Sequence, residues 1–137
     1  MSLFVDTSVW YAAADERDAS HLRGAEILKA GETLVTTDHV LVETSLLLRS
    51  RLGRAAADRF WEALRAGVAL IEIVGSADLE AAWGIGGAFP DQDFSLVDRT
   101  SFAVIQRLGI ERVASFDSDF AVFRYGRSKN RAFTVVS

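Results

Sequence analysis

Short apolar segments alternate with longer amphipathic segments along the whole of this chain. The short segments are rich in Val, Ile, Leu and Phe, which predicts buried strands, while the longer ones have the apolar spacing of helices. Strands separated by helices form a parallel sheet, because each helix returns the chain to the edge where the next strand begins. We therefore expect one α/β domain over residues 1–137, with a central, mainly parallel sheet flanked by helices on both faces.

Turn and capping residues set the expected boundaries of these elements. The strands are expected at 3–5, 33–36, 69–74, 112–116 and 132–136. The helices are expected at 7–14, 54–66, 77–88 and 95–108. One further helix is expected to begin at a cap at Asp18 or Ser20 and to end near Gly31, and another to begin at Thr37 or Asp38 and to end at Gly53. A short helical stretch is expected after a polar turn at 117–119.

The composition excludes several kinds of functional site. There is no cysteine, so disulfides, thiolate metal sites and thiol catalysis are impossible, and two histidines cannot build a multi-histidine cage. No apolar run approaches the roughly 20 residues of a membrane span, and the first residues lack the basic segment of a signal peptide. A soluble, cytoplasmic protein without membrane contact is the expectation.

The charge balance does not by itself indicate a nucleic-acid binder, because the net charge is −4. The basic residues are nevertheless mostly arginine, the side chain suited to bidentate phosphate contacts, and they are clustered. Each cluster is either a solvated surface or a phosphate contact. The clusters are Arg49, Arg51 and Arg54, and a tail without acids after Asp119 that contains Arg124, Arg127, Lys129 and Arg131.

Two acidic positions follow expected strands, at the sheet edge where ligands of parallel sheets bind. Asp6 directly follows the first strand, and Asp117 follows the strand at 112–116, with Asp119 two residues later. Local structure offers an alternative for each, because Asp6 can cap the following helix and Asp117 can form an Asx-turn.

Two further acids lie on helix faces that are otherwise apolar. Glu43 has Val40, Leu46 and Leu47 as its helical neighbours, which places its carboxylate on the face expected to meet the core. Asp98 shares its face with Phe94, Phe102 and Ile105 in the same way. A buried carboxylate needs a partner, so each is either part of a structural ion pair or a member of a functional site.

Taken together, the acids predict a shared pocket. Four carboxylates that meet in one pocket require protons or cations to neutralise them. Because the chain offers oxygen ligands and few others, the expected cation is Mg²⁺, with Mn²⁺ as an alternative. His39 and Glu43, four residues apart, are a further possible ligand pair, although a surface histidine is the alternative. Sites of this kind favour attack by an activated water on a phosphodiester.

Four short motifs resemble those of PIN domains, and most closely the VapC-type toxins of toxin–antitoxin pairs. They are Phe4-Val5-Asp6-Thr7-Ser8, Val42-Glu43-Thr44, Ser95-Leu96-Val97-Asp98-Arg99-Thr100-Ser101-Phe102 and Ser115-Phe116-Asp117-Ser118-Asp119-Phe120. The resemblance covers essentially the whole chain. It implies that Asp6, Glu43, Asp98 and an acid at Asp117 or Asp119 bind divalent metal, and that Thr7 and Ser115 line the pocket.

The resemblance implies that the protein is a toxin that hydrolyses RNA with the help of a metal ion. It also implies that an antitoxin protein inhibits this activity and that the toxin forms a homodimer. Asp6 and Asp98 are the expected direct ligands, and Glu43 or Asp117 is expected to orient the attacking water. Arg124, Arg127 and Arg131 are the candidates for RNA binding. The alternatives are a nuclease of RNA maturation or DNA-flap processing, and a non-catalytic module whose acidic pocket captures an arginine of a partner.

Overall fold

Five strands form the centre of the protein, and every neighbouring pair among them is parallel. The computed structural model describes all residues from Met1 to Ser137. The predicted α/β fold is confirmed, although the strands expected at 69–74, 112–116 and 132–136 are shorter, because only residues 70–72, 112–114 and 134–136 pair with a neighbour. The strands are β1 (Ser2–Val5), β2 (Thr33–Thr37), β3 (Leu70–Glu72), β4 (Arg112–Ala114) and β5 (Thr134–Val136), in the order β3-β2-β1-β4-β5.

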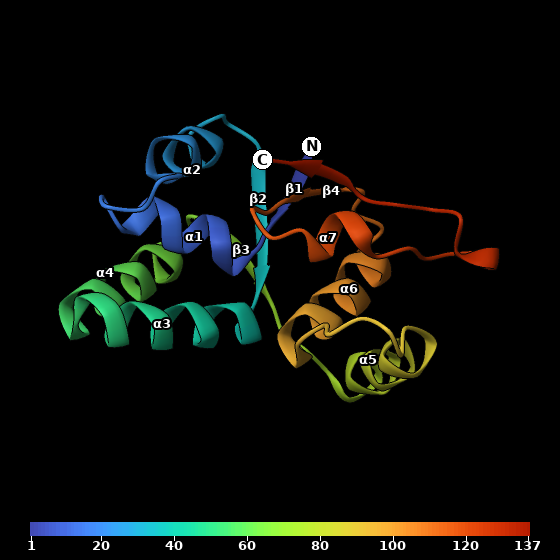
Figure 1. Ribbon diagram of the computed structural model, residues 1–137. Helices are drawn as coiled ribbons and strands as arrows, with labels where there is room; N and C mark the ends of the chain where they lie inside the picture. The colour runs from blue at the N-terminus through green and yellow to red at the C-terminus, as the bar shows by residue number, and fades with distance from the viewer.

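Helices cover both faces of the sheet, as Figure 1 shows. Helices α1 to α4 lie on one side and α5 to α7 on the other (Figure 1). None of them combines the length and the apolar character that crossing a membrane requires. They are α1 (Thr7–Ala14), α2 (His21–Leu28), α3 (Asp38–Leu52), α4 (Arg54–Arg65), α5 (Ser76–Ala88), α6 (Leu96–Leu108) and α7 (Asp119–Val122), with a short 3-10 turn, η1, at Arg127–Lys129.

The strand order reverses direction at β1, and this reversal places the candidate site. The chain first moves outward from β1 to β2 and β3, and it then returns to place β4 on the other side of β1. Because such crossovers are right-handed, the first connections cover one face and the later connection covers the other. A crevice opens at the carboxyl ends of two strands where the order reverses in this way, and these strands are β1 and β4.

An aromatic cluster fixes helix α6 against the carboxyl end of β4 and the segments that follow it. Phe102 of α6 stacks on Phe123 with ring centroids 4.1 Å apart, and it meets Phe120 of α7 edge-on at 5.0 Å. All three side chains are buried. Asp98 lies one helical turn before Phe102, so this packing also sets where Asp98 stands relative to the start of α7.

Candidate functional site

A cleft of about 540 Å³ opens where the carboxyl ends of β1 and β4 meet the helices. Its walls come from α1 and α3 on one side of the sheet, and from α6 and the loop between β4 and α7 on the other. The cleft contains all five acids that the sequence singled out, together with two more. The acidic lining residues are Asp6, Asp18, Glu43, Asp93, Asp98, Asp117 and Asp119.

Asp6 is buried at the junction of β1 and α1 and is held by hydroxyl groups. Its Oδ2 caps α1 through a long hydrogen bond of 3.5 Å from the Ser8 backbone N–H. The same oxygen accepts hydrogen bonds of 2.9 Å from the Ser8 and Ser115 hydroxyls. Asp6 is therefore both a helix cap and a part of the cleft wall.

Asp98 lies on the buried face of α6, as its apolar helical neighbours predicted, with only 8% of its surface exposed. It occupies the first turn of the helix, where the Ser95 hydroxyl accepts a hydrogen bond of 3.0 Å from the Asp98 N–H. The Asp98 carboxylate accepts a longer one, 3.4 Å, from the Ser95 N–H. These two contacts, and the positive end of the helix dipole, orient the carboxylate at the helix end that faces the cleft.

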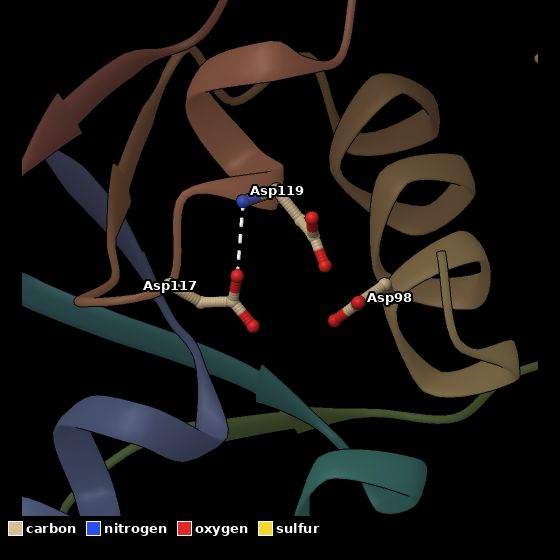
Figure 2. Close-up of side chains that lie close together, drawn as sticks. All are labelled: Asp98, Asp117 and Asp119. Atoms are coloured by element: carbon tan, nitrogen blue, oxygen red, sulfur yellow. Dashed lines mark hydrogen bonds between the residues drawn. The ribbon is translucent and has the colours of Figure 1, made fainter. Parts of the chain in front are cut away.

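Asp117 and Asp119 approach Asp98 from the opposite side, as Figure 2 shows. The carboxylate oxygens of the three aspartates lie within 4.8 Å of one another. Asp117 forms the Asx-turn that the sequence allowed, because its Oδ1 accepts a hydrogen bond of 2.9 Å from the Asp119 N–H (Figure 2). The structure therefore brings both of these acids to Asp98 rather than one of them.

Glu43 lies at the border of the buried face of α3 rather than at its centre. Of the helical neighbours that placed it on the core-facing stripe, Val40 is buried and Leu47 packs against the core, whereas Leu46 is 62% exposed. The expected stripe is therefore correct for two of the three neighbours and wrong for Leu46. The half-buried Glu43 lines the cleft from this position.

Burial and mutual repulsion raise the pKa values of three of these carboxylates. Burial raises the pKa of Asp6 to about 6 against the weaker effect of its hydrogen bonds. Burial also raises the pKa of Asp98 to about 7, and the negative charge of Asp6 adds to that shift. Burial raises the pKa of Asp119 as well, with a contribution from the charge of Asp117. At neutral pH, ionisation of these carboxylates in the folded protein therefore lowers its free energy of unfolding.

The residues of this cleft fit a divalent cation. None of the five acids that the sequence singled out takes part in an ion pair with a basic side chain. Carboxylate oxygens are the ligands that Mg²⁺ and Mn²⁺ prefer, and a bound cation removes the repulsion that raises the pKa of Asp98. The group Asp98, Asp117 and Asp119 offers three such oxygens within 4.8 Å of one another, and Asp6 lines the same cleft.

In buffers without divalent cations, we expect the protein to lose stability as the pH rises from 5 to 8. The folded state binds protons at Asp6 and Asp98 more tightly than the unfolded state, whose carboxylates have a pKa near 3.9. The contribution is complete below about pH 4 and is lost as the pH rises through 6 and 7; for Asp6 alone it is about 3 kcal/mol.

Thermal unfolding in EDTA across this pH range checks the expectation. The lowered pKa values of Asp15 and Asp78 act at lower pH, because folded states with lowered carboxyl pKa values lose stability only below about pH 4. A melting temperature that stays level or rises between pH 5 and 8 would contradict the raised pKa values of Asp6 and Asp98.

Several polar residues of the cleft were not recognised as site residues in the sequence. Ser8 donates to Asp6 and accepts a hydrogen bond of 2.9 Å from the Phe116 N–H, which ties the ends of β1 and β4 together. Tyr11 and Arg51 line the far end of the cleft. The position of Ser8 two residues after Asp6 was the only available signal, whereas Tyr11 and Arg51 meet only through the packing of α1 on α3.

The arginines of the tail are exposed to solvent, and two of them have partners within the protein. Arg131 pairs with Glu111 at 3.4 Å, an acid that precedes the tail in the sequence. Arg124 donates to carbonyl groups at the end of α7, including that of Ala121 at 2.6 Å. Neither residue lines the acidic cleft, and Arg127 is the member of the three candidates without an intramolecular hydrogen bond or ion pair.

Comparisons with known proteins agree with this geometry. A family model described as "PIN domain" matches residues 3–124. The "23S rRNA-specific endonuclease VapC20" of Mycobacterium tuberculosis is 38% identical over 121 residues, which are 87% of this chain and 92% of that protein.

Solved structures give the same picture. The crystal structure of M. tuberculosis VapC20, described as a "Sarcin-Ricin loop cleaving toxin", superposes with a TM-score of 0.83 at 35% identity, covering 88% of this chain and 93% of that one. A toxin–antitoxin complex from Klebsiella pneumoniae shares the fold with a TM-score of 0.69 at 17% identity, covering 100% and 97% of the two chains.

Proposed function

Since the chain belongs to the PIN-domain family, we propose that it is a divalent-metal-dependent endoribonuclease and the toxin of a toxin–antitoxin pair. The observation that carries the proposal is the convergence of Asp98, Asp117 and Asp119 beside Asp6 in one cleft. An acidic cleft without paired cations is poorly explained as a structural feature, because it destabilises the fold at neutral pH. It is well explained as a site that holds Mg²⁺ or Mn²⁺ against a phosphodiester.

The aspartates would hold the metal, and the surrounding residues orient them. A bound Mg²⁺ supplies an activated water and neutralises charge that develops on the phosphoryl oxygens. Ser8 and Ser115 fix the Asp6 carboxylate, and Ser95 fixes that of Asp98. Glu43 stands apart from the three-aspartate group and has no basic partner, so its carboxylate is available to orient the attacking water and accept its proton.

The substrate that we propose is RNA, and ribosomal RNA of the large subunit is the first to test. The support is the printed activity of the relative VapC20, which acts on 23S rRNA. A backbone that is cut by water must be accessible, which favours single-stranded or looped RNA. Among the arginines of the tail, Arg127 is the best remaining candidate for a phosphate contact, because Arg124 and Arg131 already have intramolecular partners.

The proposed partners are an antitoxin protein and a second copy of the chain in the cytoplasm. The support for a toxin is the resemblance to VapC20 and to structures described as toxin–antitoxin complexes. An exposed apolar surface beside the cleft supports a protein partner. It includes Val42 and Leu46 of α3, which are 55% and 62% exposed and line a pocket together with Val97 of α6.

A nuclease assay on the purified chain in Mg²⁺ separates the proposed function from its alternatives. We expect cleavage of 23S rRNA at few positions, mapped by primer extension, with DNA flap substrates left intact. The same chain with Asp98→Asn is the control for contaminating nuclease. Cleavage of the flap with RNA left intact would favour the DNA-processing alternative. An absence of cleavage on every substrate would favour the non-catalytic module.

A further inference from the structure

The acidic cleft contains a single basic side chain, Arg51 at the end of α3. Every other charged residue that lines the cleft is acidic. Helices α1 and α3 lie next to each other on the same face of the sheet (Figure 1), and Arg51 reaches across to α1. The single cation therefore stands at a point where two helices, distant in sequence, form one wall of the cleft.

Tyr11 contacts the Arg51 guanidinium without neutralising its positive charge. The guanidinium carbon lies 5.0 Å from the centre of the Tyr11 ring, a cation–π contact. The Tyr11 hydroxyl donates a hydrogen bond of 2.6 Å to Asp15 Oδ2, which fixes the ring, and the ring itself is buried. Arg51 forms no ion pair with any carboxylate. The guanidinium is thus held against the Tyr11 ring with no carboxylate partner, and its planar set of N–H donors can contact an anion.

Arg51 is separated from the acids that would hold the metal. It follows Glu43 by eight residues on α3, which is about 12 Å along the helix axis. Tyr11 similarly lies one helical turn beyond Thr7, the residue after Asp6. The cleft has an acidic end, where Asp98, Asp117 and Asp119 meet, and Arg51, which pairs with none of these acids, supplies its only positive charge.

We propose that Arg51 binds a phosphate of the RNA strand beside the one that is cut, and so positions the strand along the cleft. The proposal rests on the proposed ribonuclease function. A phosphodiester chain is repelled by seven carboxylates unless positive charge is provided along its path. A metal at the acidic end provides it for the scissile phosphate, and a planar guanidinium suits bidentate contact with the next phosphate along.

A purely structural role for Arg51 makes a different prediction. If the guanidinium only covers the Tyr11 ring, its loss lowers the melting temperature but changes neither substrate affinity nor the dependence of affinity on salt. A phosphate contact makes affinity fall with rising salt, and each contact to a single strand contributes about 0.7 to the slope of log affinity against log salt. The salt slope therefore separates the two roles.

The test compares Arg51→Gln and Arg51→Lys with a matched variant, Arg65→Gln. Arg65 is an exposed residue of α4 that does not line the cleft, and its replacement removes the same charge. Cleavage of a short oligoribonucleotide in Mg²⁺ gives kcat and KM. Binding of a fluorescent oligoribonucleotide, measured by anisotropy at several KCl concentrations in an Asp98→Asn background, gives the salt slope without turnover.

We expect Arg51→Gln to raise KM about tenfold, the effect of losing one charge-assisted hydrogen bond, with kcat within about twofold of the parent. The salt slope should fall by about 0.7, and Arg51→Lys should lie between the parent and Arg51→Gln because it keeps the charge but not the planar fork. Arg65→Gln should match the parent in KM and salt slope.

Unchanged KM and salt slope in Arg51→Gln would overturn the proposal, and so would an equal loss in Arg65→Gln, which would indicate diffuse charge. These outcomes leave metal-dependent cleavage by the parent intact. A parent chain that neither cuts nor binds RNA would instead contradict the proposed function itself. If Arg51→Gln fails to fold, Arg51→Lys provides the test. A KM and a salt slope equal to those of the parent would contradict the proposed bidentate contact between the guanidinium and a phosphate.

Discussion

Replacing Asp98 with asparagine is expected to abolish RNA cleavage while leaving the metal-free protein at least as stable as the parent. Asn keeps the shape of the side chain and one acceptor for the Ser95 N–H, but it removes a metal ligand. It also removes a charge whose cost is visible in the pKa of Asp98, raised to about 7 by burial and by the charge of Asp6. At pH 8 Asp98 of the parent is ionised and destabilises the folded state, whereas the neutral asparagine of the variant does not.

The sign of the stability change distinguishes a metal ligand from a structural ion pair. If Asp98 were the anion of a buried pair, its neutralisation would leave a buried cation alone and cost about 3–5 kcal/mol. Melting curves in EDTA at pH 8 and pH 5 measure the change, with the exposed loop variant Asp91→Asn as the control. The gain from Asp98→Asn should shrink at pH 5, where Asp98 is already protonated.

Addition of Mg²⁺ supplies the second half of this experiment. A cation that binds the folded state alone raises the melting temperature of the parent. The variant should gain less from the same concentration of Mg²⁺, because one ligand is missing. A strongly destabilised metal-free variant that still cuts RNA would contradict the assignment of Asp98 as a metal ligand.

Removal of divalent metal is expected to abolish cleavage by the parent chain completely. Excess EDTA should stop the reaction, and either Mg²⁺ or Mn²⁺ should restore it after the chelator is removed. Ca²⁺ should restore it poorly, because this larger ion accepts irregular coordination with more ligands and does not impose the tight octahedral geometry of Mg²⁺. The physical reason is the donor set, which consists of carboxylate oxygens without a basic partner.

The metal dependence is measured as the initial rate of cleavage against the concentration of each ion. A thermal shift recorded under the same conditions reports binding independently of turnover, so weak activity in Ca²⁺ can be separated from weak binding of Ca²⁺. Undiminished cleavage in excess EDTA would remove the metal-dependent mechanism. It would leave the identification of the fold untouched, since that rests on the sheet order and on the family match.

The acids of the cleft were predictable from the sequence to different degrees. Asp98 was predicted for the correct reason, because a carboxylate among Phe94, Phe102 and Ile105 at helical spacing does lie on the buried face. For Glu43, the assignment of the buried face of α3 was correct for Val40 and Leu47 but not for Leu46, which is exposed. The apolar side chains of this helix exceed what its neighbours cover, so periodicity alone could not show which stripe meets the core.

The choice between Asp117 and Asp119 could not be made from spacing. An Asx-turn between the two directs both carboxylates toward Asp98 (Figure 2), and this depends on the backbone of a loop. The partners of the tail arginines were likewise not visible in the sequence. These cations are partly occupied by Glu111 and by helix-end carbonyls, partners that lie next to them only in the folded chain.

The sequence by itself determined the class of fold and the chemistry available to the site. The periodicities of strands and helices extend over a few residues, so a short segment of sequence is enough to recognise them. The amino-acid composition, without cysteine and with two histidines, leaves mainly oxygen ligands, which suit a hard cation such as Mg²⁺. Tertiary structure alone decided that β4 pairs with β1, which brings the acid after each strand to one crevice. It also decided that Arg51 meets Tyr11, because contacts between distant segments depend on how whole helices pack.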